Sequence, residues 1–258
     1  DSYRKLFDHF QPQLLVGLTA TPERMDGKDL RPDFGNRISA EIRLPQALQA
    51  GLLTPFQYLC ISDDTDLSDD SLWSGQKYNI ERLADKLCAK TRAQLIVDAL
   101  HKYLADEYTC RALCFCVNKR HADFMAEQLR LYGFNAQSLT SDTPAEERKQ
   151  LAKDLREGTL HYLCVVDIFN EGVDIPEVDT VLFLRPTESL TIFLQQLGRG
   201  LRLSAGKTEL TVLDFVAQAN RKYDFASRFR ALTLQPEKNI QKQIKEGFTL
   251  LPLGCSIV

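Results

Sequence analysis

The residues best suited to chemistry are at positions 195–202, which read Gln-Gln-Leu-Gly-Arg-Gly-Leu-Arg. The two arginines, Arg199 and Arg202, are three residues apart, so a helix presents both from one face. Gly198 has no side chain and lets another surface approach closely. A guanidinium is always protonated and forms paired hydrogen bonds to phosphate oxygens. The octet therefore suits the charge that builds on a phosphoryl group during transfer, although an arginine pair alone indicates only a solvated helix end.

Two further segments carry recognisable patterns. Residues 165–176 read Val-Val-Asp-Ile-Phe-Asn-Glu-Gly-Val-Asp-Ile-Pro after an apolar run typical of a strand, and residues 16–22 read Val-Gly-Leu-Thr-Ala-Thr-Pro. In chain order, the three segments resemble motif III (Ser/Thr-Ala-Thr), motif V (Gly-x-Asp) and motif VI (Gln-x-x-Gly-Arg-x-x-Arg) of superfamily-2 helicases and translocases. One tripeptide is weak evidence, but three matches in order over most of the chain indicate this family strongly.

The resemblance implies catalytic roles for the matching residues of motif VI. In this family ATP lies in the cleft between two RecA-like domains, of which the first supplies the P-loop, the Mg²⁺ ligands and the base. The second domain closes over the nucleotide. Arg199 and Arg202 would then reach the γ-phosphate as arginine fingers, with Gln195 beside them.

The resemblance also implies a nucleotide-binding role for the end of motif V. Asp174 would accept hydrogen bonds from the ribose hydroxyls, with Gly172 allowing close approach as Gly198 does in motif VI. The alternative for Asp174 is a turn residue before Ile175-Pro176. In motif III, Thr19 and Thr21 would couple the nucleotide state to domain closure, unless they only cap a loop.

Nucleic acid in these motors runs across both domains and is held through its phosphates by backbone N–H groups and hydroxyls. Loops at strand ends are the candidates for these contacts: Asn118 and Lys119 after one strand, and Thr140 and Ser141 after the next. Val166 stands where the family most often has threonine, so one hydroxyl contact is missing.

The type of nucleic acid follows from finer details of the motifs. Thr-Ala-Thr-Pro-Glu-Arg and Glu-Gly-Val-Asp-Ile-Pro resemble DNA-repair and restriction translocases, and motif VI lacks the His-Arg-x-Gly-Arg common in DEAD-box RNA helicases. We therefore expect DNA as the partner, with RNA left open, and no membrane.

The chain lacks two motifs that a motor of this family needs. Gly206-Lys207-Thr208 looks like the end of a P-loop, but five residues rather than four separate it from Gly200, and a strand follows where a helix must begin. An Asp-Glu-x-His/Asp motif is also absent from the sequence. We therefore expect that the missing first RecA-like domain completes the site and that this chain alone does not hydrolyse ATP. The alternative is a degenerate RecA-like module for protein interaction without ATPase activity.

Composition excludes several other classes of protein. The chain is 44% hydrophobic and 26% charged with a net charge of −3, which provides no broad basic surface for indiscriminate nucleic-acid binding. No apolar run approaches the ~18 residues that span a bilayer, and residues 1–5 have no signal-peptide layout, so we expect a cytoplasmic protein.

Cys114 and Cys116 lie in an apolar run and no Cys-x-x-Cys pair occurs. We therefore expect buried free thiols and no metal site.

From residue 91 onward, helical patterns alternate with apolar strands. The expected helices are 91–107, 119–132, 143–158 with a capping box at Thr143-Pro144-Ala145-Glu146, and 189–201; the expected strands are 111–117, 134–139, 160–166, 180–184 and 209–215. This order predicts an α/β fold with a parallel sheet covered on both faces, a three-layer architecture that the resemblance identifies as RecA-like.

The preceding residues show a different pattern. We expect a helix at 2–10, strands at 14–18, 38–44 and 56–61, a helical turn at 45–50, and an exposed acidic loop at 63–76 anchored by Trp73. The predicted organisation is a remnant of a first RecA-like domain (1–62, motif III), a linker and leading helix (63–90), the RecA-like helicase C-terminal domain (91–235, motifs IV to VI) and the start of a following segment (236–258).

Overall fold

The computed structural model describes most of the chain and divides it into two compact units, Asp1–Arg43 and Leu44–Val258. The described residues are 5–6, 9–10, 13–18, 31–75, 77–166, 174–187, 189–219, 226–233, 242–243, 248 and 251–258. The predicted helix at 2–10 falls largely outside them. Each unit is described by itself.

The first unit contains a 3-10 helix, η1 (Arg31–Phe34). Two predicted strands are wrong: residues 14–18 and 38–43 form no strand. Leu14 and Leu18 are 80% and 95% exposed, and within the part of the chain that the structure describes no strand pairs with them. A strand needs a neighbour to bond its N–H and C=O groups, so apolar composition alone is not sufficient.

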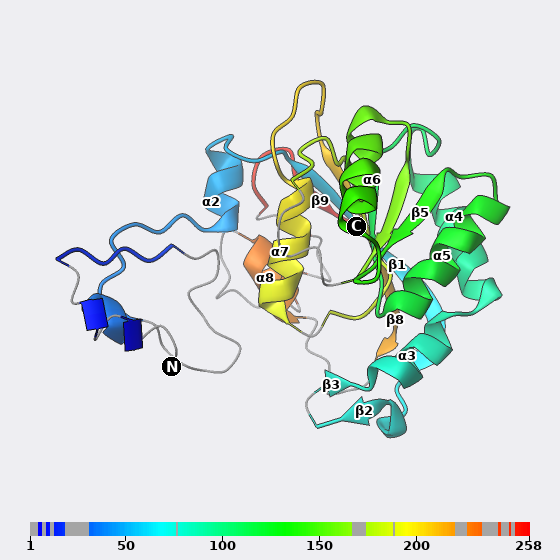
Figure 1. Ribbon diagram of the computed structural model, residues 1–258, viewed down its shortest axis with the longest axis horizontal. Coiled ribbons are helices and arrows are strands. Elements are labelled where there is room, and N and C mark those ends of the chain that lie inside the picture. The colour runs from blue at the N-terminus through cyan, green and yellow to red at the C-terminus, as the bar shows by residue number, and fades with distance from the viewer. Residues whose placement is uncertain are drawn as a thin grey trace. The chain divides into compact units, whose positions relative to one another are not determined.

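The second unit is built on a seven-stranded parallel sheet with the order β5-β6-β4-β7-β8-β1-β9 (Figure 1). The strands are β1 (Phe56–Leu67), β4 (Ala112–Phe115), β5 (Ala136–Leu139), β6 (Tyr162–Val165), β7 (Thr180–Phe183), β8 (Leu210–Ala219) and β9 (Ser256–Ile257). Every residue of β4, β6 and β7 is buried, as their continuous apolar runs predict for strands covered on both faces.

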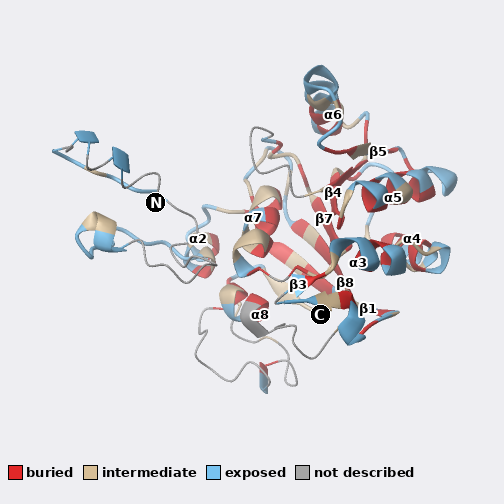
Figure 2. Ribbon diagram, turned by 60° about the horizontal axis from the view of Figure 1, so that its bottom comes forward, coloured by how far each residue is buried: buried red, intermediate tan, exposed pale blue. Residues whose placement is uncertain are grey.

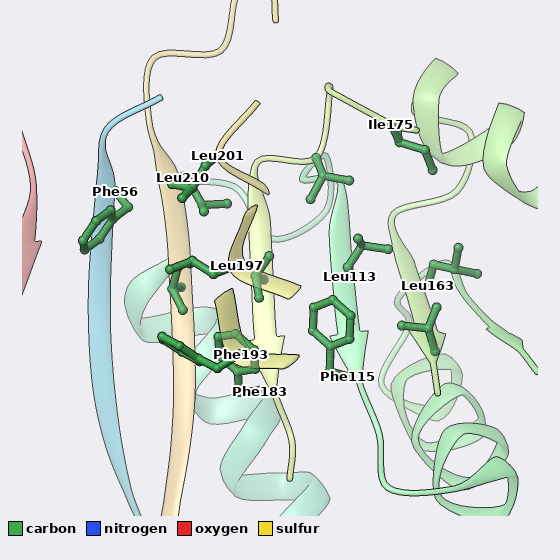
Figure 3. Packing of buried hydrophobic residues seen from close by; sticks show 14 of the residues in the cluster. Phe56, Leu113, Phe115, Leu163, Ile175, Phe183, Phe193, Leu197, Leu201 and Leu210 are labelled. Carbon is green, nitrogen blue, oxygen red and sulfur yellow. The ribbon is translucent and has the colours of Figure 1, made fainter. Parts of the chain in front are cut away.

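Helices cover both faces of this sheet, which confirms the predicted three-layer architecture. They are α2 (Leu44–Gln49), α3 (Ile80–Leu87), α4 (Lys90–Tyr103), α5 (Lys119–Leu131), α6 (Ala145–Glu157), α7 (Leu190–Gly200) and α8 (Ala226–Leu232). Alternate residues of one strand face opposite sides of the sheet: Phe115 belongs to the hydrophobic cluster that includes residues of α6, α7 and α8, whereas Cys114 belongs to the cluster that includes residues of α4 and α5. Figure 2 shows the buried strands between the helices. Figure 3 shows the cluster of buried hydrophobic residues around Phe115, Phe183 and Phe193.

Capping residues account for several helix ends, but one predicted cap is wrong. Asn118 caps α5 and Ser189 caps α7 through their side-chain oxygens, while Gly158 ends α6 with φ 77°. The predicted capping box at Thr143 is wrong. Pro144 is the residue before α6, and the Thr143 hydroxyl instead accepts a hydrogen bond from the Thr140 N–H at 3.0 Å.

Strand β1 changes the predicted domain boundary. It continues past residue 62 into the segment predicted as an exposed loop, and it pairs with β8 from Phe56↔Leu210 to Leu67↔Ala219. A small hairpin follows, β2 (Trp73–Ser74) with β3 (Lys77–Tyr78), after the 3-10 helix η2 (Asp70–Leu72). At the other end of the chain, β9 pairs with β1, so residues 256–257 also belong to this sheet rather than to a following segment.

Within the acidic segment, Asp63 is buried because its charge is paired. The carboxylate of Asp63 lies 2.6 Å from Arg92 Nε, with both side chains 2% exposed, and Arg92 Nη2 also donates to the Leu184 carbonyl. Burial alone would raise the pKa of Asp63, but Arg92 and hydrogen bonds from Thr65 hold it below its usual range. The stabilisation by this pair is therefore present above about pH 4 and is lost as the pH falls.

Replacing Asp63 with alanine should destabilise the 258-residue chain by about 3–5 kcal/mol, because it leaves the buried Arg92 charge without compensation. Urea unfolding followed by circular dichroism measures this change. Asp64→Ala is the matched control, because Asp64 is the exposed neighbour in the same strand and its loss should change stability by at most about 0.5 kcal/mol. Equal effects of the two variants would contradict the assignment.

Candidate functional site

The arginine-bearing octet forms the end of α7, and its packing explains why the helix ends there. Phe193 and Leu197 face the core, and Figure 3 shows Leu201 close to Leu210, which opens β8. A Cβ on Gly200 would lie 2.5 Å from a Leu210 methyl carbon, so only glycine lets the helix end this close to the sheet. Around Gly198, in contrast, no described atom lies within 4 Å of the position of an added Cβ.

Arg199 and Arg202 lie together beside one carboxylate. Arg202 forms an ion pair with Asp174, in which the side chains are 41% and 68% exposed. Burial and the charge of Arg202 lower the pKa of Arg199, and Asp174 opposes this shift. Two guanidinium groups thus lie close together at a half-buried position, and a guanidinium forms paired hydrogen bonds with anionic oxygens. Gln195, one turn earlier in α7, is exposed.

The octet is held at the amino edge of the sheet, where the parallel strands begin. Thr54, two residues before β1, donates its N–H to the Leu201 carbonyl at 2.8 Å and its hydroxyl to the Arg202 carbonyl at 3.0 Å. The segment of Asp174 is held by α6, because Arg156 Nη2 donates to the Asp174 carbonyl at 2.8 Å. Sequence reasoning missed Thr54 and Arg156, which no motif distinguishes.

Three of the predicted site residues lie outside the described residues. They are Thr19 and Thr21 of the motif III segment and Gly172 of the motif V segment. Their roles stay predictions.

The predicted nucleic-acid contacts lie at the opposite, carboxyl edge of the sheet. Lys119 Nζ lies 2.6 Å from the Asp142 carboxylate, which brings the loop after β4 to the loop after β5. Asn118 caps α5, and its amide donates to Glu81 at 3.1 Å. Thr140 is buried and its hydroxyl accepts from the Asp142 N–H, whereas Ser141 is exposed. The structure thus brings these residues together, with Lys119 and Ser141 at the surface.

The structure also describes the P-loop-like turn and the cysteines of the apolar run. Gly206-Lys207-Thr208 lies in a turn before β8, with Gly206 at φ 79°, so no helix N-terminus follows it and the rejection of a P-loop is confirmed. Cys114 and Cys116 are buried free thiols.

Across the described part of the chain, no group of three or more His, Cys, Asp or Glu residues could hold a metal ion. Within the same part, no helix is long and apolar enough to cross a membrane.

This fold recurs in solved structures of two restriction enzymes. "The fragment structure of a putative HsdR subunit of a type I restriction enzyme from Vibrio vulnificus YJ016" is similar with a TM-score of 0.65 and 24% identity, over 83% of this chain and 42% of that one. The structure titled "ATP-dependent Type ISP restriction-modification enzyme LlaBIII bound to DNA" follows with a TM-score of 0.56 and 15% identity, over 89% of this chain and 17% of that one. These likenesses show a RecA-like fold.

Sequence comparison shows the family. The model of the helicase conserved C-terminal domain matches residues 76–204, half of the chain, and the chain belongs to this family. It is 27% identical over 227 residues to "Putative ATP-dependent helicase IRC3" of Saccharomyces cerevisiae, covering 85% of this chain and 32% of that protein. It is 24% identical over 276 residues to the type I restriction enzyme EcoKI endonuclease subunit of Escherichia coli, covering 95% of this chain and 23% of that protein. The chain therefore spans about a third or less of the length of these two relatives.

Replacing Asp174 with asparagine should change the free energy of unfolding by less than about 1 kcal/mol, because an exposed ion pair contributes little to stability. Urea unfolding of the 258-residue chain measures this. A loss above about 2 kcal/mol would instead identify Asp174 as a structural turn residue, the alternative that its position before Ile175-Pro176 leaves open.

Proposed function

We propose that this chain is the second RecA-like half of an ATP-dependent helicase or translocase and works within a longer protein. One observation carries the proposal: Arg199 and Arg202 are held together beside Asp174 at the amino edge of the sheet. Membership in the helicase C-terminal family supports it. A module kept only for protein interaction has no need of such a cluster.

The reaction we propose is attack of water on the γ-phosphoryl group of ATP, with ADP as the leaving group. Its loose transition state spreads negative charge over the phosphoryl oxygens. Arg199, and Arg202 with it, would stabilise that charge, because a guanidinium held in a half-buried site costs no reorganisation at the moment of reaction. Gln195 is exposed on the same helix and would orient groups beside them.

ATP fits the residues that the structure brings together. The two neighbouring guanidinium groups suit a polyphosphate. Asp174 is 68% exposed, so its carboxylate is accessible to ribose hydroxyls. Bound Mg²⁺ would neutralise phosphate charge. We propose that residues outside this chain hold the ion and the triphosphate, since the sequence contains no G-x-x-x-x-G-K-[ST] motif.

Nucleic acid would bind at the carboxyl edge, away from the arginines. Lys119 and the exposed Ser141 border the loops after β4 and β5, and the helix N-terminus of α5 adds backbone N–H groups that favour phosphate. We propose DNA rather than RNA as the track, because the motifs resemble those of restriction-type translocases and one relative is a restriction endonuclease subunit.

The longer protein should hydrolyse ATP faster in the presence of its nucleic acid, and Arg199→Ala should lower kcat by about 10³–10⁵-fold. Phosphate release with and without single- and double-stranded DNA and RNA measures both effects. Arg230→Ala is the control, because Arg230 is an exposed arginine of α8 and not a residue of the octet. The 258-residue chain alone should show no turnover.

Three results would contradict these expectations. Robust hydrolysis by the 258-residue chain would show that it contains a complete site. Turnover of the longer protein that is insensitive to Arg199→Ala would remove the arginine-finger role. Absence of turnover under every condition would favour the protein-interaction module.

Lys119→Ala should weaken binding of the longer protein to duplex DNA at all sequences and reduce the salt dependence of binding, the slope of log K against log [salt], by about 0.9. Fluorescence anisotropy at several salt concentrations gives this slope. Lys149→Ala removes an exposed lysine on α6 and serves as the charge-matched control. An unchanged slope for Lys119→Ala would exclude a phosphate contact at this position.

A further inference from the structure

Lys207 makes contacts that neither the motifs nor the family comparison assigns. Its side chain reaches from the turn before β8 to three backbone carbonyls, those of Gly200 at 2.5 Å, Arg202 at 3.0 Å and Pro176 at 3.1 Å. An ammonium group has three protons, so each has one acceptor here. Gly206 precedes it at φ 79°, a left-handed conformation that glycine adopts without strain.

These three carbonyls belong to the two segments that form the arginine site. Those of Gly200 and Arg202 lie at the end of α7, where helical carbonyls have no partner within the helix and the helix dipole favours a cation. The carbonyl of Pro176 lies two residues beyond Asp174. One cation therefore connects the arginine-bearing helix end to the segment that carries the carboxylate.

The surroundings of Lys207 favour a fixed position. Burial lowers the pKa of Lys207 to about 8, and the nearby carboxylates of Asp179 and Glu177 oppose this shift. A partly buried ammonium that has protein acceptors for all its protons is less free to move than a solvated surface lysine.

We propose that Lys207 is a positioning residue, whose ammonium fixes Arg199 and Arg202 relative to Asp174 so that the guanidiniums meet the γ-phosphate. This inference rests on the proposed function. Thr54 provides a natural comparison, because its hydroxyl donates to the same Arg202 carbonyl but makes no hydrogen bond with the described residues of the Asp174 segment. Of Thr54 and Lys207, only Lys207 is hydrogen-bonded both to the end of α7 and to the segment of Asp174.

The test measures kcat and KM for ATP in the longer protein, well below the melting temperature of each variant. Lys207→Met should lower kcat by about 10²-fold with a much smaller change in KM, because a small misplacement of a catalytic group has an effect of this size. Lys207→Arg keeps a cation with N–H donors and should recover part of kcat. Thr54→Val should cost less than Lys207→Met, and Lys149→Met, on exposed α6, should match the wild type.

A double-mutant cycle separates positioning from plain destabilisation. If Lys207 acts through Arg199, then Arg199→Ala should cost much less in the Lys207→Met background than in the wild type. Additive effects, or an unchanged kcat in folded Lys207→Met, would overturn the proposal. If Lys207→Met does not fold, Lys207→Gln, which lacks the charge, takes its place in the cycle.

Hydrogen exchange of the 258-residue chain gives a readout that does not need activity. Lys207→Met should speed amide exchange both at 199–206 and at 174–178, whereas Thr54→Val should affect only the first segment. Unchanged exchange at 174–178 would overturn the connection. A wild-type longer protein that does not hydrolyse ATP would instead overturn the proposed function, and with it the catalytic role of Lys207, even where the exchange result holds.

Discussion

The parallel sheet imposes the constraint on which the candidate site depends. Parallel strands cannot be joined by short turns, so each connection crosses back over a face of the sheet and all strands begin at one edge. Segments far apart in the sequence therefore lie next to one another at that edge. The residues before β1, β7 and β8 and the end of α7 meet at the amino edge, where Thr54 and Lys207 both donate to the Arg202 carbonyl and Lys207 also donates to the Pro176 carbonyl. The arginine cluster is a consequence of this topology.

Buried hydrogen bonds and ion pairs hold β1, the strand that begins two residues after Thr54. Tyr58 of β1 donates to the Asp214 carboxylate of β8 at 2.6 Å, and Arg228 of α8 lies 3.0 Å from the same oxygen. Burial raises the pKa of Asp214, while Arg228 opposes this shift. Together with the pair between Asp63 and Arg92, this network connects β1 to helices on both faces of the sheet. Thr54 is thereby fixed two residues before a strand that cannot easily shift.

The sequence predicts the central fold well because the signal there is local. Apolar runs such as residues 112–115 and 180–183 are typical of strands buried on both faces, and helical periodicity recurs between them. The same signal misleads where burial depends on distant partners. Residues 14–18 have strand composition but no neighbouring strand in the described part of the chain, while residues 63–67, predicted as an exposed loop, continue β1 and bury Asp63 and Leu67. No local pattern reports that Arg92 neutralises Asp63.

In the candidate site, too, some residues can be predicted from the sequence and others only from the structure. The types and spacing of Arg199 and Arg202 are visible in the sequence, and the structure brings both to Asp174. The residues that hold them, Thr54 and Lys207, carry no motif because they act through backbone carbonyls, which any sequence supplies. Gly206-Lys207-Thr208 drew attention for its likeness to a phosphate-binding loop, and its lysine instead bonds the end of the arginine-bearing helix.

The proposed role of this chain is to supply guanidinium charge to the transferring phosphoryl group. It predicts a difference between ligands, because a group that acts in the transition state binds its analogue more tightly than a ground-state or product ligand. The most direct measurement compares the affinities of the longer protein for ADP–aluminium fluoride and for ADP alone, in wild type and Arg199→Ala. We expect the variant to lose most of its affinity for the fluoride complex and little for ADP. Equal losses for both ligands, or none, would contradict the claim.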